Sequence, residues 1–293
     1  MKNNILKQKE RKIIFLFLFF PLTLLILFGI IPVIALIFYS FTSWNGLSTV
    51  KEFIGLDNYI KIISEPKYLE AFKNNIYYLI SGLLQIIIAL FFAILLSQKV
   101  KFKGFFKASF IFPSLVSGVA ISMIFKMFFQ PGGDLDQLLI FLGLEKYIGF
   151  WIGDPDYVNY SLASISLWRH TGISFLIYFG AIQSIPEEYY KVAEIEGSNF
   201  IQKIRYVILP NIKTVLKINF ILLIIGSISV FEIPLIMTNG SNGTSTFLLK
   251  TMKTAFDKKM VGLASAMAVI VTIVIIILTI LQKKIYRNDR DEY

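Results

Sequence analysis

The clearest pattern along the chain is a series of long apolar segments separated by short polar ones. Residues 13–50, 74–98 and 260–282 contain no charged side chain. A helix needs about 20 residues to cross a hydrocarbon core roughly 30 Å thick, so each of these segments is long enough to span a membrane. Together with three weaker apolar segments they predict six spans, at 13–38, 74–97, 106–128, 158–182, 213–236 and 260–282. The pattern therefore predicts an all-α membrane protein with six transmembrane helices.

Two of these spans have features of their own. The first follows a basic stretch, as a signal peptide would, but it is longer than the 7–15 apolar residues of such a peptide. No small-x-small site follows it cleanly, so we expect a retained helix. The third span contains Pro113, which we expect to kink the helix without ending it, because neighbouring helices can satisfy the freed carbonyl.

Composition agrees with a membrane protein. Hydrophobic residues make up 56% of the chain and charged residues only 16%, against about 25% charged in soluble domains. The net charge of +10 does not indicate a nucleic-acid partner, since the basic residues are scattered between apolar spans. The absence of cysteine excludes disulfides and cysteine-ligated metals, and a single histidine excludes a His-rich metal site.

The distribution of Lys and Arg predicts the orientation. The segments on the side of the two termini (1–12, 98–107, 183–217 and 283–293) hold 18 basic residues, whereas the opposite loops hold 9. Positive residues are enriched in cytoplasmic loops. Both termini are therefore predicted in the cytoplasm of a multi-pass plasma-membrane protein. Four lysines in the last external loop go against this rule.

The cytoplasmic segment 183–217 predicts two short helices joined by a glycine. Ser184 is expected to cap the first helix in a capping box with Glu187, and Pro186 suits its first turn. Gly197 is expected to end that helix in the left-handed conformation. A second amphipathic segment runs to Pro210, which is expected to punctuate the chain before the fifth span. The segment is either an amphipathic linker in the headgroup layer or an element that docks into a groove on a cytoplasmic partner.

Segment 186–210, PEEYYKVAEIEGSNFIQKIRYVILP, resembles the cytoplasmic "EAA" loop of binding-protein-dependent permeases. Ala193, Gly197 and the closing run to Pro210 match the pattern of that loop. The departures are Lys191 for the usual glutamate, Val192 for alanine, Glu196 for aspartate and Ser198 for alanine. The lost glutamate puts in doubt any coupling detail that depends on a carboxylate at position 191.

Further segments extend the resemblance over nearly the whole chain. YSFTSWNG at 39–46, FIGLDNY at 53–59 and MTNGSNGTSTFLLKTMKTAFDKKMVGLASAMA at 237–268 are similar to the start and end of sugar-type permeases. The chain looks most like the first permease of lactose, glycerol-3-phosphate and multiple-sugar importers. It lacks the large external insertion of the maltose permease, because loop 39–73 is too short for a domain.

This resemblance implies a type I ABC importer permease fold. Residues 1–70 would hold a cytoplasmic N-tail, an accessory helix and a short external loop. Residues 71–285 would form a five-helix core with the coupling loop 183–212, and 286–293 a cytoplasmic tail. The implied partners are a second, similar permease, two cytoplasmic ATPase subunits and an extracytoplasmic solute-binding protein. The residues implied to couple to an ATPase are Glu187, Tyr190, Lys191, Ala193, Glu196, Gly197, Ser198 and Pro210.

No ATP-binding machinery is predicted on this chain. The phosphate-binding sequence G-x-x-x-x-G-K-[ST] does not occur, so ATP and Mg²⁺ are expected on the partner ATPase, and no cofactor on this chain. No catalytic constellation appears in the loops, which argues against a membrane enzyme, and a pore subunit is equally disfavoured. The main alternative is an ion-coupled secondary transporter, which would favour carboxylates near span centres.

Polar residues within the spans are the candidates for a translocation pathway. Arg169 and His170 lie near the middle of the fourth span, where a charge needs partners or water. They either face a cavity for a polar solute or make structural contacts. Trp168 either stacks on a sugar ring or packs at an interface, and Asn219 and Glu232 either line the cavity or join helices, as does Gln85. Small hydroxylated residues commonly serve helix packing, which is the expectation for the serines of the fifth span.

Overall fold

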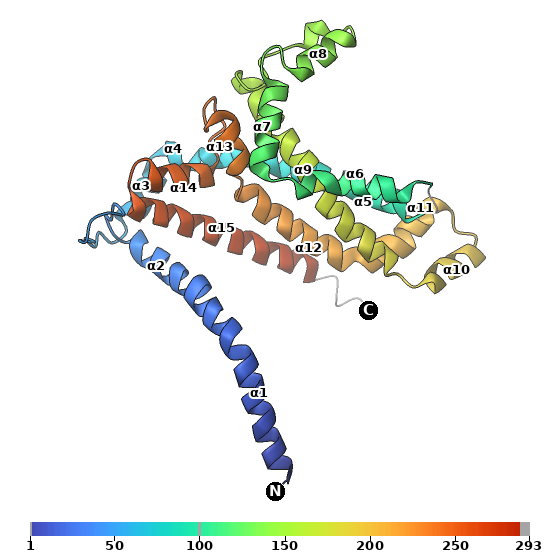
Figure 1. Cartoon of the computed structure of the whole chain (residues 1–293), viewed down its shortest axis with the longest axis horizontal. Coiled ribbons are helices and arrows are strands. Elements are labelled where there is room, and N and C mark those ends of the chain that lie inside the picture. Colours follow the sequence, from blue (N-terminus) through green and yellow to red (C-terminus); the bar gives the residue numbers. More distant parts are fainter. Residues whose placement is uncertain (1, 99–100, 288–293) are drawn as a thin grey trace. The chain divides into compact units, whose positions relative to one another are not determined.

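The computed structural model describes residues 2–98 and 101–287. Apart from one isolated bridge between Thr42 and Phe53, the regular structure in these ranges is helical, as Figure 1 shows. The prediction of an all-α protein is confirmed. Positions 288–293 of the predicted C-terminal tail lie outside the described residues.

The chain folds into two compact units, and each is described by itself. Unit 1 comprises residues 2–64 and 251–272, and unit 2 comprises 65–98, 101–250 and 273–287. The helices of unit 1 are α1 (Lys2–Leu25), the π-helix η1 (Ile26–Ile30), α2 (Ile31–Ser40) and α3 (Asp57–Ser64). Those of unit 2 are α4 (Pro66–Leu69), α5 (Ala71–Ser97), α6 (Lys103–Leu115), α7 (Gly118–Phe129), α8 (Asp134–Phe141), the 3₁₀-helix η2 (Glu145–Tyr147), α9 (Pro155–Gln183), α10 (Glu187–Ile195), α11 (Phe200–Lys203), the π-helix η3 (Ile204–Ile208), α12 (Leu209–Ile228) and α13 (Glu232–Thr238). Both units share α14 (Phe247–Phe256) and α15 (Val261–Arg287).

Several helices are long and apolar enough to cross a membrane. By length and composition they are Ile13–Ser40, Pro66–Ser97, Phe200–Thr238 and Val261–Lys284, and a fifth is gained if α6 and α7 count as one broken span. The fourth predicted span coincides with α9, which has 29 residues but is too polar to meet the same criterion. The count of six is therefore not reproduced, although a multi-pass helical protein is.

The third predicted span is not a single helix. The axes of α6 and α7 differ by 98°, and Pro113 lies inside α6 rather than at the bend. The chain turns at Val116 and Ser117, which both have extended backbones. Ser117 then caps α7 by accepting a hydrogen bond from the backbone N–H of Ala120 (3.2 Å). A serine cap after the proline starts a new helix in a new direction, so two helices at a sharp angle stand where one kinked helix was predicted.

Unit 2 is built around α5 and α9, which pack along one another, with α6 and α12 against them. Two apolar clusters fill this bundle. One includes Phe175 of α9 with Ile208 and Ile212, and the other includes Ile165 of α9 with Tyr78 of α5. The polar middle of α9 therefore lies between two dry cores.

Candidate functional site

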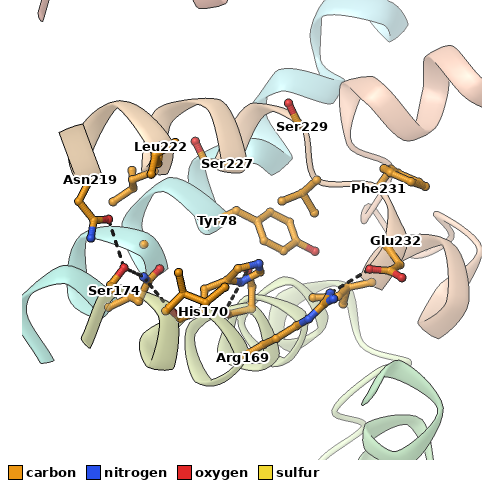
Figure 2. Close-up of a pocket in the computed structure, with 18 of the residues that line it drawn as sticks. Tyr78, Arg169, His170, Ser174, Asn219, Leu222, Ser227, Ser229, Phe231 and Glu232 are labelled. Atoms are coloured by element: carbon orange, nitrogen blue, oxygen red, sulfur yellow. Dashed lines mark hydrogen bonds and ion pairs between the residues drawn. The ribbon is translucent and has the colours of Figure 1, made fainter. Parts of the chain in front are cut away.

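A cavity of about 310 Å³ opens at this polar middle of unit 2 (Figure 2). Residues of α5, α9 and α12, and the segment that leads into α13, form its walls. Its polar lining consists of Tyr78, Gln85, Ser166, Arg169, His170, Ser174, Asn219, Ser227, Ser229 and Glu232. Four of the five predicted pathway residues, and Gln85, thus line one cavity.

A chain of hydrogen bonds crosses the cavity wall from α5 to α12. The amide of Gln85 donates to the hydroxyl of Ser174 (2.6 Å) and to the carbonyl of His170 (3.1 Å). The Ser174 hydroxyl donates in turn to Oδ1 of Asn219 (3.1 Å). Nδ2 of Asn219 and the hydroxyl of Tyr78 are both buried without a hydrogen-bond partner among the described residues. Buried polar groups are normally paired, so two unsatisfied groups at one cavity favour a polar ligand there.

The imidazole ring of His170 adds a further polar atom to the same cavity. Its Nδ1 lies 2.8 Å from the backbone carbonyl of Ser166. A carbonyl can only accept, so Nδ1 carries the proton of this hydrogen bond. In the neutral ring Nε2 is then left as an acceptor, available to a solute hydroxyl.

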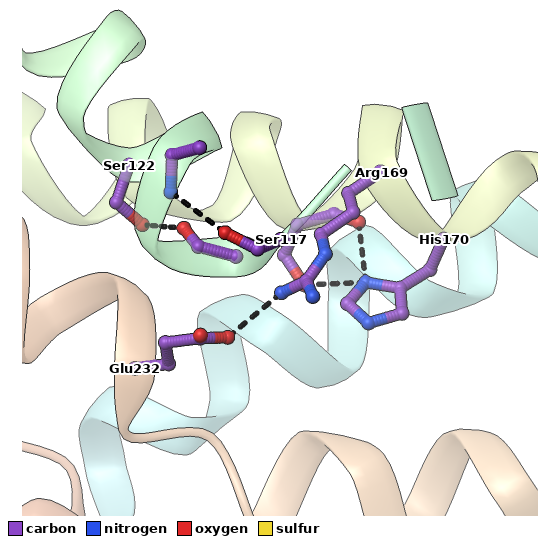
Figure 3. Close-up of polar contacts among 8 residues, drawn as sticks. Ser117, Ser122, Arg169, His170 and Glu232 are labelled. Atoms are coloured by element: carbon purple, nitrogen blue, oxygen red, sulfur yellow. Dashed lines mark hydrogen bonds and ion pairs between the residues drawn. The ribbon is translucent and has the colours of Figure 1, made fainter. Parts of the chain in front are cut away.

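Arg169 and Glu232 form an ion pair, with Nη1 of the arginine 2.9 Å from Oε2 of the glutamate (Figure 3). Glu232 is the first residue of α13 and packs against Gly118, the first residue of α7, where a Cβ atom would overlap both partners of the pair. A carboxylate is favoured at helix N-termini, and a charge at membrane depth needs a partner. The pair therefore ties α9 to the starts of two other helices.

Trp168 lies apart from these groups. It is absent from the cavity lining, and its ring packs edge-on against Phe125 of α7 with centroids 5.3 Å apart. The packing interpretation of Trp168 fits this geometry, and stacking on a solute in the cavity does not.

The predicted coupling segment forms α10, a tight turn and α11. Gly197 has φ +72°, and the amide of Ser198 donates to the carbonyl of Ala193 (2.9 Å) while that of Gly197 donates to Glu194 (3.0 Å). These two bonds make the Schellman motif that glycine favours at a helix end. The predicted glycine turn is confirmed.

Two details of this segment were predicted wrongly. Ser184 does not cap α10, because its hydroxyl donates back to Ala181 at the end of α9 (2.8 Å) and Pro186 precedes α10 instead. The capping box lies one helix later, where Asn199 and Gln202 exchange side-chain and backbone hydrogen bonds.

Pro210 does not interrupt the helix in which it lies. The helix runs on from α11 through the π-helical η3 into α12. In η3 the backbone N–H of Leu209 donates to Ile204, and the Asn211 amide donates to the carbonyl of Val207 (2.7 Å). A π-helical turn and a side-chain donor accommodate the missing N–H of the proline, which is how a helix can continue through it.

The faces of α10 differ sharply. Ala193 is buried in the cluster that contains Phe175, and the half-buried Tyr190 packs against it; burial raises the pKa of the Tyr190 phenol. The outer face exposes Tyr189, Val192 and Ile195, the last with 87% of its surface accessible.

Glu194 accepts a hydrogen bond from Lys203 of α11 (2.8 Å), which lowers the pKa of its carboxyl. The elbow formed by α10 and α11 is thus fixed on its inner side, and its outer side carries a row of apolar residues among exposed charged ones.

Known proteins match this chain over most of its length. Residues 85–288 match the family described as "Binding-protein-dependent transport system inner membrane component". The probable ABC transporter permease protein YurN of Bacillus subtilis is 32% identical and covers 97% of this chain and 99% of its own. The chain belongs to this family of ABC transporter permeases.

Two further proteins are similar to the permease. The multiple sugar-binding transport system permease protein MsmF of Streptococcus mutans is 29% identical, covering 93% of the permease and 94% of its own chain. A bacterial alginate ABC transporter, solved in complex with an alginate pentasaccharide-bound periplasmic protein, has a chain with a TM-score of 0.84 at 18% identity, covering 96% of each chain. The type I importer permease fold is confirmed, and the permease is a non-catalytic subunit of an ATP-driven transporter.

Sequence reasoning missed some residues of both regions. Tyr78 and Ser174 line the cavity and were not among the predicted pathway residues; Tyr78 lies seven residues before Gln85, two turns along one face of α5. Likewise, Tyr189, Val192 and Ile195 form the exposed face of α10, whereas the predicted Tyr190 and Ala193 point inward. The spacing i, i+3, i+6 of the exposed residues was the available signal.

Proposed function

We propose that the permease forms half of the translocation pathway for a carbohydrate, which passes through the cavity between α5, α9 and α12. The observation that carries this proposal is the pair of buried, unsatisfied groups, Nδ2 of Asn219 and the hydroxyl of Tyr78. Sugar hydroxyls both donate and accept, so they can satisfy an amide N–H, a phenol and the Nε2 atom of His170 together. The names of the Streptococcus mutans relative and of the alginate transporter support carbohydrate as the solute class.

The charges of the cavity favour an uncharged sugar. Among the described residues, Arg169 and Glu232 are the only charged ones in its lining, and they neutralise one another at 2.9 Å. An acidic sugar would have to take Arg169 from its partner, leaving Glu232 unpaired in surroundings of low dielectric. The half of the pathway that this permease contributes therefore favours neutral oligosaccharides over acidic ones.

The elbow of α10 and α11 is proposed to couple the permease to an ATPase. Its hydrogen-bonded turn and the exposed Tyr189, Val192 and Ile195 support insertion into a groove on the ATPase, against the alternative of an amphipathic linker in the headgroup layer. Glu187, Lys191, Glu196, Gly197 and Ser198 would surround that contact, with Pro210 at the end of the loop. The complete importer would contain a second permease, two cytoplasmic ATPases that bind ATP and Mg²⁺, and an extracytoplasmic solute-binding protein.

In this arrangement both termini and the elbow lie in the cytoplasm of a plasma-membrane protein. The distribution of 18 against 9 basic residues supports this orientation. An ion-coupled transporter has less support, because the one carboxylate in the cavity lining, Glu232, is already paired with Arg169.

The test is uptake of labelled oligosaccharides into proteoliposomes that contain the complete importer. We expect uptake that needs ATP and the binding protein, and that is faster for neutral than for acidic sugars of equal length. Uptake by this permease alone, driven by a proton or sodium gradient, would refute the ATP-driven mechanism. Equal transport of acidic sugars would refute only the preference for neutral ones.

A further inference from the structure

The segment that follows the first span is tied to the end of that span. In unit 1, the side-chain amide of Asn58 on α3 donates to the carbonyls of Ser40 and Thr42, both at 2.9 Å. The hydroxyl of Tyr59 donates to the hydroxyl of Ser40 (2.7 Å). Since Ser40 is the last residue of α2, these three bonds hold α3 at the level where the first span ends.

The start of the last span contacts the segment that follows the first span. The N–H of Gly262, the second residue of α15, donates to the carbonyl of Trp44 (2.8 Å). The backbone of Thr42 approaches Gly262 so closely that a Cβ atom there would overlap the Thr42 carbonyl. The loop that follows the first apolar span thus meets the start of the last one, and a bilayer crossed by both helices would have its surface at this junction, beside which α3 lies.

Three kinds of side chain divide the surface of α3. Asn58 and Ile62 point into unit 1, and Ile62 is completely buried. On the opposite side, Ile60 is 60% and Ile63 67% exposed. The polar residues of α3, Asp57, Lys61 and Ser64, lie in a strip between these two sides at helical spacing. A helix with a protein side, an apolar exposed side and a polar strip suits the boundary between lipid and water.

Residues beside α3 have the same character. Phe53 and Leu56, which precede it, are 70% and 59% exposed. The rings of Tyr39 and Trp44 pack with centroids 4.4 Å apart, and the ammonium of Lys51 lies 4.6 and 4.7 Å from their centroids. Tyrosine and tryptophan concentrate at membrane–water interfaces, and long lysine side chains reach out of them to water.

We propose that α3 is an interfacial anchor of the permease, lying in the headgroup layer of the bilayer at the end of the first span. Phe53, Leu56, Ile60 and Ile63 insert between the upper ends of the acyl chains, while Asp57, Lys61 and Ser64 face water. We expect lipid to cover the apolar side of α3 for two reasons. This side continues from the first span, whose most apolar stretch has no buried residue. It also lies at the depth of Ser40 and Gly262, where the first span ends and the last one begins. Its role is to hold the external end of the first span at one depth and orientation.

The permease has no cysteine, so single cysteines can report the surroundings of α3 directly. Three single variants, Leu56→Cys, Ile60→Cys and Ile63→Cys, are each labelled with an environment-sensitive fluorophore. The full chain is then placed in nanodiscs of phosphatidylethanolamine and phosphatidylglycerol. Quenching by lipids brominated high on the acyl chain is compared with quenching by aqueous iodide. Asp57→Cys and Ser64→Cys, on the polar strip of the same helix, are the matched controls.

We expect brominated lipid to remove most of the fluorescence of labels at 56, 60 and 63, and iodide to have little effect on them. At 57 and 64 the order of the two quenchers should be reversed. If iodide quenches the labels at 60 and 63, this side faces water and the proposal is overturned. If neither quencher reaches them, a protein surface covers α3, and lipid is the wrong occupant.

Discussion

Nη1 of Arg169 and Oε2 of Glu232 lie 2.9 Å apart, and this single contact joins α9 to the first residue of α13 beside the break between α6 and α7. The two side chains are 22% and 34% exposed, so the pair is shielded only in part within this chain. A movement of α13 away from α9 has to break the pair, and α7 packs on α13 beside it. The ion pair should therefore oppose any separation of α9 and α13 that widens the cavity.

Removing one partner of this pair should cost more than removing both. Arg169→Met or Glu232→Leu leaves a charge without its partner, whereas the double variant leaves none. A double-mutant cycle on the thermal stability of the purified importer should give a coupling energy of about 1.5–3 kcal/mol, the range for hydrogen bonds to charged groups. Gly118→Ala, whose methyl group would displace the pair, should resemble the single variants. Additive effects of the two single changes would show that the contact does not stabilise the fold.

Asn219 should be needed for passage of the solute. Asn219→Ala removes the amide that is free to bind a hydroxyl, and should lower ATP-driven sugar uptake by about tenfold, equivalent to the 1–1.5 kcal/mol of a typical hydrogen bond. Sugar affinity of the isolated binding protein is measured separately, so the loss can be assigned to the permease. Ile218→Ala, at an exposed neighbouring position, is the control and should leave uptake unchanged. An equal loss in both variants would place the effect outside the cavity.

Local patterns predicted more of this protein than distant contacts did. The apolar segments gave most of the helices, and the glycine at 197 gave the end of α10, because both depend on residues close in sequence. Arg169, His170, Asn219 and Glu232 were selected simply because polar groups are costly in a span, and the fold brings them to one cavity.

What was missed depends on the fold. Ser117 as the cap of a new helix competes with continuation of the span, and hydropathy alone does not decide between them. The orientation of α10 was missed for a similar reason, since Tyr190 and Val192 look equally apolar in sequence. Only the packing of Tyr190 and Ala193 into the cluster that contains Phe175, Ile208 and Ile212 sets which face is exposed.

Gly197→Pro should separate ATP hydrolysis from transport. Proline cannot adopt φ +72°, and it removes the N–H that donates to Glu194 (3.0 Å). We expect normal membrane insertion, but ATP hydrolysis that no longer drives uptake in proteoliposomes. Gly197→Asn is the matched control, because asparagine tolerates the left-handed region and should keep coupling. Coupled uptake at the normal rate by the proline variant would count against docking through the elbow.

The link between α10 and α11 should weaken in acid. Lys203 lowers the pKa of Glu194 by donating a hydrogen bond to it and by its charge. Because the folded pKa is below the ordinary 4.5, the link stabilises the elbow above that pH and is lost as the pH falls through the lowered pKa. Lys203→Met should therefore reduce the melting temperature slightly at neutral pH, by an amount that shrinks as the pH falls below 4.5. A difference that grows in acid would contradict this assignment of the lowered pKa.

Gly262→Ala should destabilise unit 1 although alanine is the better helix former. The added methyl group would collide with the carbonyl of Thr42, which is backbone and cannot rotate away. Either α15 or the loop at 42–44 has to move, straining the hydrogen bond from Gly262 to Trp44, and overpacking of this kind costs about 1–3 kcal/mol. Gly180→Ala is the matched control: Gly180 lies in α9 with no atom within 4 Å of the new methyl group, so helix propensity should make that change neutral or stabilising by up to about 1 kcal/mol. Thermal unfolding of the two variants in one detergent provides the comparison, and equal melting temperatures would mean that the close approach of Thr42 to α15 does not constrain the protein.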